Sequence, residues 1–496
     1  MIISQTLREA RKTEEVWEKT IREEERPLFH LTARTGWMND PNGFCCYGGK
    51  YHMFYQYNPY SSYWDSMHWG HAVSRDLLHW EFLPAALAPD ETYDYNGCFS
   101  GSAIEMPDGQ MLLMYTGVRL EHGKDGRPME VQTQNIAIGD GIDFEKYQGN
   151  PVIDEKQLPK GGSRNDFRDP KIMRASDGSY LALIANRPED GSGQILAYSS
   201  TDCLHWTYKG KLAENHCRFG RMWECPDFFF LDGSWVLLTS PQDMLPQGFE
   251  YHNGNGTLCL IGDYDEAACR FDEKHDQAID YGIDFYAPQT VLMPDGRRVM
   301  IGWLQNWDAI AIREKSDPWA GQMSIPRELS IRDGRLWQWP LRELEDHRGP
   351  LIEHCGQEIS GVTRLEGIRG RVLDMELTLH VTENEEGFHR FAMWFAEDEE
   401  FHTGISYRPH EKTLKIDRKF SGSRRAIIHQ RRAKAYPKND ELKLRIVLDR
   451  FSVEIFVNGG EQVMSAALFT PLSADGISFR CDGKAVIDVR CWELER

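Results

Sequence analysis

The sequence predicts an all-β protein, in which a five-bladed β-propeller is preceded by a short N-terminal helix and followed by a C-terminal β-sandwich. Three observations predict this fold. From about residue 28 the chain changes to short alternating runs bounded by Gly, Pro, Asn and Asp, as is typical of β-strands. A short motif that ends in an aromatic residue then recurs at nearly constant spacing. Alternating runs resume after a charged connector near residue 341.

The first element is a helical pattern over residues 5–25. Apolar residues such as Leu7 and Val16 form a narrow stripe among many charges, and Pro27 ends the pattern. We therefore assign residues 1–27 to a surface helix that packs on the body of the protein through that stripe.

An internal repeat marks the blades. Residues 74–80 (Ser-Arg-Asp-Leu-Leu-His-Trp) match residues 200–206 (Ser-Thr-Asp-Cys-Leu-His-Trp) at five of seven positions, and weaker copies end at Tyr147 and Phe271. The aromatic ends lie 67, 59 and 65 residues apart, which suits a four-stranded blade with long loops. Residues 28–340 would hold close to five such units. The alternative is a coincidental recurrence of an Asp-x-x-x-aromatic pattern.

A charged stretch at 341–357 interrupts the alternating pattern of β-strands, and we assign it as a linker. Alternating segments follow it at 371–381, 391–395, 442–448, 452–457 and 477–480. Together they predict a β-sandwich domain over residues 358–496. This domain would cover propeller surface or mediate a homodimer.

Composition excludes several classes of function. The 57 Lys and Arg against 77 Asp and Glu give a net charge of −20, which argues against a nucleic-acid or anionic-membrane partner, although a locally basic pocket stays open. No apolar stretch reaches the ~18–20 residues of a transmembrane helix, and the N-terminus lacks the apolar core of a signal peptide, so we expect a cytoplasmic protein. Eleven Cys without regular spacing predict neither a disulfide framework nor a zinc site. We expect no metal and no organic cofactor.

Three acidic residues stand out by their local sequence. Asp40 lies in the tight-turn sequence Trp-Met-Asn-Asp-Pro-Asn-Gly (37–43), which would hold it on a rigid loop where a strand begins. Asp169 follows an arginine, whose charge would keep it ionised. Glu224 lies between apolar neighbours, where burial would favour the protonated acid and so a proton donor. Turn capping, an ion pair or an edge-strand proline explains each residue equally well when it is taken alone.

The three carboxylates lie in successive repeats of the chain. Equivalent inner-strand positions of a propeller meet at one mouth, so we expect these side chains to converge there. They would repel one another unless their protonation states differed. A glycosidase needs such a set, with one ionised nucleophile, one protonated acid and a third group that binds sugar hydroxyls. The 15 Trp and 19 Tyr agree with this prediction, since aromatic rings stack on sugar rings.

Several blocks of the sequence resemble glycoside hydrolase family 32, the β-fructofuranosidases, which include invertase, sucrose-6-phosphate hydrolase and exo-acting fructan hydrolases. The blocks occur in the family order, and with similar segments in the predicted sandwich the resemblance covers about residues 28–496. They are residues 37–43, Phe99-Ser100-Gly101-Ser102, Arg168-Asp169-Pro170, Glu224-Cys225, and further stretches at 285–289, 301–303, 319–327 and 449–458.

The resemblance implies a retaining mechanism on a terminal β-fructofuranoside. Asp40 would attack the anomeric carbon, and Glu224 would protonate the leaving oxygen and then activate water. Asp169 would bind two fructosyl hydroxyls and stabilise the oxocarbenium-like transition state. The fructosyl subsite would be lined by Asn39, Gln56, Trp64, Phe99, Ser100, Arg168, Tyr286 and Trp303. From the residues alone, Trp64 is either a core residue or, after a polar turn, a loop residue near the mouth.

The preferred substrates are sucrose and sucrose 6-phosphate, followed by short fructo-oligosaccharides. The basic loop at 216–221 lies just before Glu224, and we hypothesise that its Arg218 helps to hold the aldose and a 6-phosphate. The alternative is a solvated loop whose charges pair with nearby acids.

Three other functions stay open. A fructosyltransferase on the same scaffold differs only in the acceptor, and abundant oligosaccharide products at high sucrose concentration would identify it. A sugar-binding propeller would show no turnover. An α-L-arabinofuranosidase or xylosidase of the related five-bladed clan would act on those aryl glycosides and not on sucrose.

Overall fold

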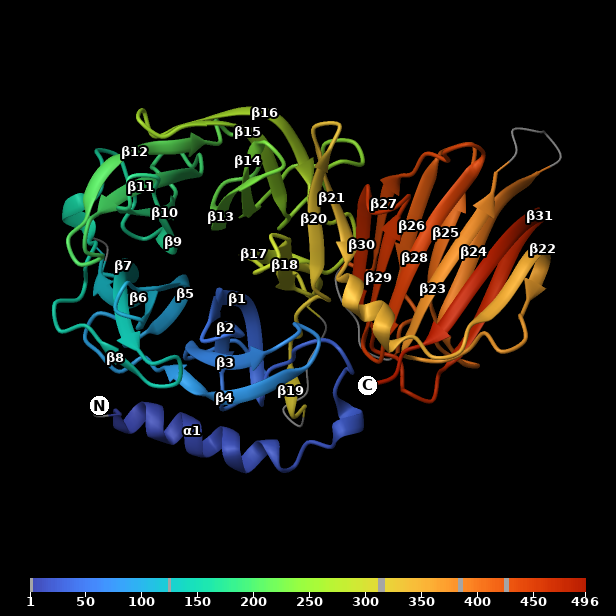
Figure 1. Cartoon of the computed structure of the whole chain (residues 1–496), viewed down its shortest axis with the longest axis horizontal. Helices are drawn as coiled ribbons and strands as arrows, with labels where there is room; N and C mark the ends of the chain where they lie inside the picture. The colour runs from blue at the N-terminus through green and yellow to red at the C-terminus, as the bar shows by residue number, and fades with distance from the viewer. Residues whose placement is uncertain (1–2, 124–125, 311–316, 382–386, 423–427) are drawn as a thin grey trace.

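The computed structural model describes residues 3–123, 126–310, 317–381, 387–422 and 428–496. In these ranges the chain forms a five-bladed β-propeller beside a sandwich-like β-domain, with one α-helix at the N-terminus (Figure 1), so the predicted fold class is confirmed. None of the helices in these ranges has the length and apolar character needed to cross a membrane.

The N-terminal helix α1 (Gln5–Glu18) is shorter than the predicted 5–25. Ser4 caps it, because its hydroxyl accepts a hydrogen bond from the backbone N–H of Leu7 at 3.1 Å. The helix lies along the outer strand of the first blade (Figure 1) and buries Leu7 and Glu14. Val16, expected in the apolar stripe, is 54% exposed. The buried carboxylate of Glu14 instead accepts a hydrogen bond from the backbone N–H of the propeller residue Ala85 at 2.9 Å. A polar contact therefore replaces part of the predicted apolar one. A short 3-10 turn, η1 (Glu23–Glu25), follows the helix.

Each blade is an antiparallel sheet whose first strand lies nearest the axis. Blade 1 contains β1 (Gly36–Tyr47), β2 (Lys50–Asn58), β3 (His68–Ser74) and β4 (Trp80–Leu87). Blade 2 contains β5 (Gly97–Glu105), β6 (Met111–His122), β7 (Pro128–Gly139) and β8 (Phe144–Lys146). Blade 3 contains β9 (Phe167–Arg174), β10 (Tyr180–Asn186), β11 (Gln194–Ser200) and β12 (Thr207–Glu214), after the turn η2 (Glu155–Gln157). Blade 4 contains β13 (Trp223–Leu231), β14 (Ser234–Pro241), β15 (Leu258–Asp265) and β16 (Arg270–Ala278). Blade 5 contains β17 (Tyr286–Leu292), β18 (Arg298–Trp303), β20 (Arg327–Arg332) and β21 (Arg335–Pro340), with the turn η3 (Trp307–Ala309) after β18.

Three of the four copies of the repeat, those in blades 1, 3 and 4, span the turn between the third and fourth strands, whereas the copy at 143–147 covers strand β8 of blade 2. In both full copies a serine hydroxyl closes the turn. Ser74 accepts a hydrogen bond from the N–H of Leu77 at 2.8 Å, and Ser200 accepts one from Cys203 at 2.9 Å. The two full copies are thus one local turn motif at equivalent places in blades 1 and 3, so the distance between them spans two blades.

Strand β19 (Trp319–Ala320) closes the propeller. It runs parallel to the start of β1 and pairs with Gly36 and Trp37, so the last blade of the chain is joined to the first. The following Gly321 has a φ of +90°, and a Cβ atom there would lie 2.1 Å from the carbonyl oxygen of Met38. Only glycine permits this close approach.

The predicted linker contains regular secondary structure. It begins with the 3-10 turn η4 (Arg342–His347), and strand β22 (Ile352–Thr363) starts inside the stretch 341–357 that was expected as linker. The C-terminal domain further contains β23 (Leu373–His380), β24 (Phe388–Glu397), β25 (Thr403–Arg408), β26 (Thr413–Asp417), β27 (Gln430–Lys434), β28 (Glu441–Asp449), β29 (Ser452–Val457), β30 (Gln462–Ala467) and β31 (Gly476–Glu493).

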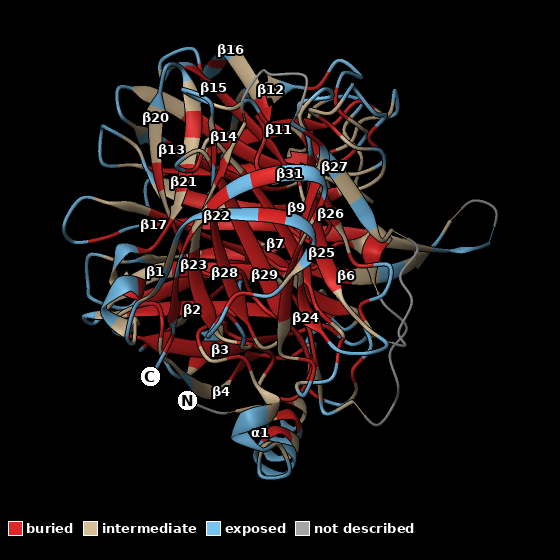
Figure 2. Ribbon diagram, turned by 90° about the vertical axis from the view of Figure 1, so that its right-hand side faces the viewer, coloured by how far each residue is buried: buried red, intermediate tan, exposed pale blue. Residues whose placement is uncertain are grey.

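These ten strands form one continuous sheet that folds over at β31. The first half of β31 pairs with β24 and the second half with β23, while β22 runs along both halves. Alternate residues of the two arms are buried in one apolar core, and β22 lies largely exposed at the edge (Figure 2). One folded sheet therefore supplies both layers of the sandwich.

Buried charges join the two domains. The Arg327 guanidinium lies 2.6 Å from Glu454 and 3.0 Å from Asp280, and all three side chains are at most 1% exposed. His30, which precedes the first blade, lies 2.8 Å from Asp449 and 3.1 Å from Glu454. Because an unpaired buried charge is costly, these contacts fix one relative placement of the two domains.

Candidate active site

The inner strand of every blade is interrupted by a β-bulge at the same level. The ladder shifts register in β1, β5, β9, β13 and β17. Four of these bulges contain a proline, which has no N–H to contribute to a ladder: Pro41, Pro170, Pro226 and Pro288. A bulge redirects the side chains beside it. Asp40, Asp169 and Glu224 lie at the bulges of β1, β9 and β13, so the three carboxylates come from blades 1, 3 and 4 and not, as predicted, from successive repeats.

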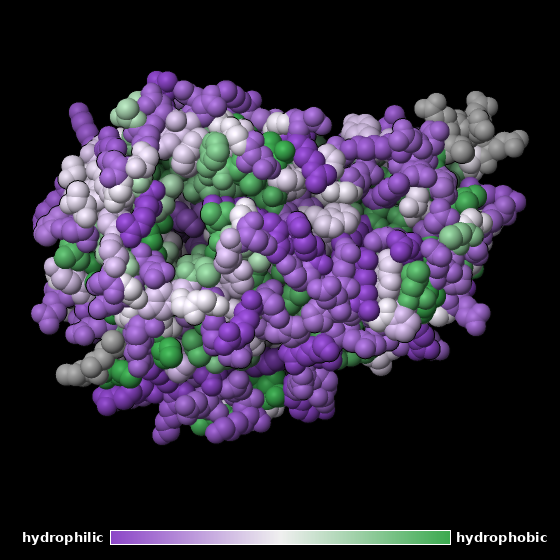
Figure 3. Space-filling model, viewed as in Figure 1, coloured by the Kyte–Doolittle hydropathy of each residue, from purple (hydrophilic) through white to green (hydrophobic). Residues whose placement is uncertain are grey.

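A cavity of about 580 Å³ lies at this level, and the propeller is hollowed on the face seen in Figure 3. Nine of the residues predicted for the site line it: Asn39, Asp40, Gln56, Trp64, Phe99, Ser100, Arg168, Asp169 and Glu224. Tyr286 and Trp303 are fully buried and are not among its lining residues. Lining residues that the sequence did not predict are Glu130, Gln132, Asn165, Asp166, Gln242, Asp243, Asn255 and Trp307.

Asp40 presents one bonded and one free oxygen. Its Oδ2 accepts a hydrogen bond from the Ser100 hydroxyl at 2.9 Å and lies 3.4 Å from the Cys225 thiol. Its Oδ1 has no hydrogen-bond partner in the described part of the chain. Burial, reinforced by the negative charge of Glu224, raises the pKa of Asp40 to about 6. The carboxylate is thus held by one oxygen, and the other is left for a ligand.

Asp169 lies next to Asp40 across the same thiol. Its Oδ2 accepts a hydrogen bond from the backbone N–H of Cys225 at 3.0 Å and lies 3.6 Å from the sulfur. Burial raises the pKa of Asp169 to about 7, although the charge of Arg168 opposes the change. Arg168 thus acts on Asp169 in the predicted direction but offsets only part of the effect of burial, since it lies 3.9 Å away and makes its shorter contacts with other carboxylates.

Glu224 is held at both carboxylate oxygens. The Nε and Nη2 atoms of Arg168 donate to Oε1 at 3.0 and 2.8 Å, and the hydroxyl of Tyr286 donates to Oε2 at 2.7 Å. The apolar surroundings expected from the neighbours in sequence are thus wrong, since strands β9 and β17 supply polar partners. Within the described ranges, no group of three His, Cys, Asp or Glu side chains is arranged to hold a metal ion.

Aromatic side chains form the rim and the wall behind the cavity. Trp64 is 45% exposed and meets Phe99 edge to face, with ring centroids 6.0 Å apart, so it is a residue of the mouth and not of the core. Trp303 packs behind the cavity against Trp37 and Trp307. Of these three, Trp307 reaches the cavity.

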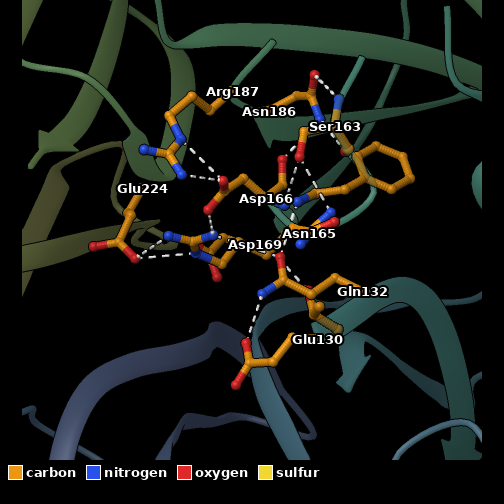
Figure 4. Close-up of polar contacts among 12 residues, drawn as sticks. Glu130, Gln132, Ser163, Asn165, Asp166, Asp169, Asn186, Arg187 and Glu224 are labelled. Carbon is orange, nitrogen blue, oxygen red and sulfur yellow. Dashed lines mark hydrogen bonds and ion pairs between the residues drawn. The ribbon is translucent and has the colours of Figure 1, made fainter. Parts of the chain in front are cut away.

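Arg168 also binds Asp166, which the sequence did not single out. The Nη1 atom of Arg168 donates to Asp166 Oδ1 at 2.9 Å. Arg187 binds Asp166 Oδ2 through Nε and Nη2 at 2.9 and 2.6 Å (Figure 4). A sequence signal for this contact exists. Asp166 directly precedes strand β9, and alternate residues of an extended segment face the same side, so this spacing could have placed Asp166 beside Arg168.

A second cavity of about 1,190 Å³, here called the outer chamber, shares Asn165, Asp166 and Asp243 with the first. Four arginines and four acids are among its lining residues: Arg164, Arg187, Arg218, Arg221, Asp166, Glu189, Asp190 and Asp243. Arg218, predicted to hold a phosphate, is bound to Glu273 at 2.9 Å and to Asp276 at 3.3 Å. The alternative interpretation, a loop cation paired with nearby acids, describes Arg218 better.

The sequence matches the family profile for the glycosyl hydrolases family 32 N-terminal domain over residues 30–340 and the profile for the family's C-terminal domain over 343–493. It is 37% identical to the raffinose invertase of Escherichia coli over 482 residues, which cover 94% of this chain and 95% of that protein. It is also 37% identical to a sucrose-6-phosphate hydrolase of Escherichia coli over 450 residues, 89% of each chain. Among solved structures, a variant of the GH32 β-fructofuranosidase of Bombyx mori in complex with sucrose superposes with a TM-score of 0.84 at 31% identity, covering 100% of this chain and 99% of that one.

Proposed function

The chain belongs to glycoside hydrolase family 32, and from that premise we propose that it is a β-fructofuranosidase that releases terminal fructosyl groups from sucrose or sucrose 6-phosphate. The observation that carries the proposal is the meeting of three carboxylates at one cavity, each in a different setting. Asp40 has a free oxygen, Asp169 is buried against a backbone N–H, and Glu224 is bound at both oxygens.

Asp40 is the proposed nucleophile. Its unpartnered Oδ1 attacks the anomeric carbon of the fructosyl group while the bond to the leaving oxygen breaks. Ser100 and Cys225 hold the other oxygen, so the carboxylate needs no reorientation before attack. The product of this step is a covalent fructosyl-enzyme ester.

Glu224 is the proposed acid and base. In the first step it gives its proton to the leaving oxygen, and in the second it takes a proton from the water that attacks the anomeric carbon and releases Asp40. Two displacements at one carbon retain its configuration. Asp169, on the far side of the Cys225 thiol from Asp40, is proposed to bind fructosyl hydroxyls and to stabilise the positive charge that develops on the sugar ring.

The cytoplasm is the proposed site of action. Relatives that this chain resembles over 89% and 95% of its length are named sucrose-6-phosphate hydrolases. A sugar phosphate is charged and is retained inside a cell once it is formed. Activity assayed in separated cell fractions with sucrose 6-phosphate tests this placement.

A substrate panel tests the proposed function. Released fructose is measured with sucrose, sucrose 6-phosphate, raffinose, inulin and levan, and NMR of the first product identifies its anomer. We expect β-fructofuranose as the first product and the highest kcat/KM with sucrose or its phosphate. First-formed α-anomer would overturn the retaining mechanism. Oligosaccharides as the main product at high sucrose would identify a transferase, and activity only on arabinosides or xylosides would refute the proposal.

A further inference from the structure

We propose that Asp166 is a positioning residue that divides the charge of Arg168 between two carboxylates and so limits how strongly this guanidinium favours the ionised form of the Glu224 side chain. The proposal rests on the proposed role of Glu224 as the acid. Four side chains of alternating charge carry the proposal, in the order Arg187, Asp166, Arg168 and Glu224. Figure 4 labels the first, second and last of them.

Neighbouring side chains in this series form short ion pairs. Arg187 lies 2.6 Å from Asp166, Asp166 lies 2.9 Å from Arg168, and Arg168 lies 2.8 Å from Glu224. Arg168 is the shared member, since its Nη1 faces Asp166 and its Nε and Nη2 face Glu224. One guanidinium therefore serves two carboxylates.

The inner members of the chain are shielded from water. The side chains of Arg168, Glu224 and Asp166 are 9%, 14% and 16% exposed, whereas Arg187, at the wall of the outer chamber, is 36% exposed. Charges that are enclosed in this way act on one another with little screening. A change of charge at Asp166 therefore alters the electrostatic potential at Glu224.

Other charged groups face the same atoms. Asp40 and Asp169 act on the site from β1 and β9, and Tyr286 binds Glu224 from β17. Glu130, Asp243, Glu189, Asp190, Arg164, Arg218 and Arg221 line the two cavities. None of these groups is itself replaced in the Asp166 and Arg187 variants, so both variants change the charge of the ion-pair series alone.

The sign of each effect follows from the charges. Neutralising Asp166 leaves the cation of Arg168 to Glu224 alone, which favours the carboxylate and makes the acid easier to deprotonate. Neutralising Arg187 has the opposite effect, because Asp166 then draws more strongly on Arg168. Loss of either partner would disturb a merely structural ion pair in the same way, so opposite effects are diagnostic.

The test is the pH dependence of kcat/KM for sucrose in Asp166→Asn, Arg187→Gln and the double variant. We expect the alkaline limb to move about one pH unit toward acid in Asp166→Asn, and toward alkali in Arg187→Gln. The double variant should lie between them. Asp272→Asn, which breaks the exposed Arg270–Asp272 pair on β16, is the matched control and should leave the profile unchanged.

Two further variants guard against loss of folding. Asp166→Glu and Arg187→Lys keep the charges and should restore limbs close to that of the parent enzyme, with Tm measured for every protein. Shifts of the same sign in Asp166→Asn and Arg187→Gln, or no shift, would overturn the inference. Failure of the proposed function is recognised separately. If Glu224→Gln hydrolyses sucrose at the parent rate, then Glu224 is not the acid, whatever the two profiles show.

Discussion

The imidazole of His30 lies 2.8 Å from the carboxylate of Asp449, in the sealed joint between propeller and sandwich. Burial, the largest influence, opposes a charge on the ring, but the hydrogen bonds to Asp449 and Glu454 outweigh it and raise the pKa of His30 to about 9. The same contacts lower the pKa of Asp449, although burial alone would raise it. His30 is thus a cation at neutral pH and part of the joint.

Alkaline pH should weaken this joint. A histidine whose pKa rises from 6.5 to about 9 on folding contributes stability that is complete below pH 6.5 and is lost as the pH passes 9. The loss should reach about 3 kcal/mol between pH 7 and 10. Chemical unfolding at each pH measures it, and His30→Gln should lack this part of the pH dependence. His205→Gln, whose side chain is 83% exposed in the parent, is the control. A similar alkaline loss in His30→Gln would contradict the assignment.

Asp40→Asn should lower the activity and raise the stability of the protein. Loss of the nucleophile should reduce kcat at least about 1,000-fold. Because burial raises the pKa of Asp40 to about 6, ionising it in the folded protein costs roughly 3 kcal/mol above that pH and nothing below pH 3.8. We therefore expect a higher Tm than the parent at pH 8 and equal Tm values at pH 3.5. An equal Tm at pH 8 would show that the carboxylate is not strained, and full sucrose turnover would refute its role.

The loss of kcat/KM in Glu224→Gln should depend on the leaving group. An alkoxide leaving group such as the glucose of sucrose needs a proton, whereas a nitrophenolate leaves without one. We expect kcat/KM to fall at least about 1,000-fold for sucrose and far less for p-nitrophenyl β-fructofuranoside. Tyr286→Phe, which removes the 2.7 Å hydrogen bond to Oε2 and keeps the acid, should give a smaller loss for sucrose. Equal losses for both substrates in Glu224→Gln would argue against an acid role.

The two cations of the loop at 216–221 should differ in their effect on phosphate preference. Arg218 is neutralised by Glu273 and Asp276, whereas Arg221 forms no ion pair with a carboxylate in the described ranges. Arg221→Ala should lower the ratio of kcat/KM for sucrose 6-phosphate over sucrose by about 5- to 10-fold. Arg218→Ala should leave the ratio unchanged. The reverse result would restore the hypothesis made from the sequence.

Alkylation should distinguish the cysteines. Cys217 is exposed and lines the outer chamber, Cys355 is exposed on β22, and Cys225 is buried, where burial raises the pKa of its thiol. Iodoacetamide at pH 8 should modify Cys217 and Cys355 and spare Cys225, as mass spectrometry will show. Modification should raise KM for sucrose several-fold, and Cys217→Ser should prevent the increase. An increase that persists in Cys217→Ser would place the effect elsewhere.

Local sequence predicted those parts of the fold that local chemistry determines. The Ser-x-Asp turn of blades 1 and 3 forms from its own residues, so the spacing of its two copies matches the length of two blades. Strand β22 escaped prediction over 352–357 because it is an exposed edge strand with no alternating apolar face. Helix α1 was overextended, since the buried face includes Glu14, a polar residue that sequence periodicity assigns to solvent.

Site residues could be predicted where the whole motif lies on one strand. Asp40 and Asp169 directly precede a bulge proline and Glu224 lies two residues before one, so the recurrence of that proline on four inner strands marks the site in the sequence. The partners of Glu224 depend on which blades meet, so the contacts of Arg168 and Tyr286 could not be derived from their own strands. The same holds for Trp307.

Closure of the propeller by β19 has a consequence for synthesis on the ribosome. The start of β1 lacks its parallel neighbour until residue 320 has left the exit tunnel, and the backbone N–H groups of Leu28 and Phe29 find the Asp449 carboxylate only when most of the second domain has been made. A nascent chain released early would hold Asp40 on an unfinished ring. Activity should therefore appear abruptly, with nearly full-length product, and not in proportion to the number of blades completed.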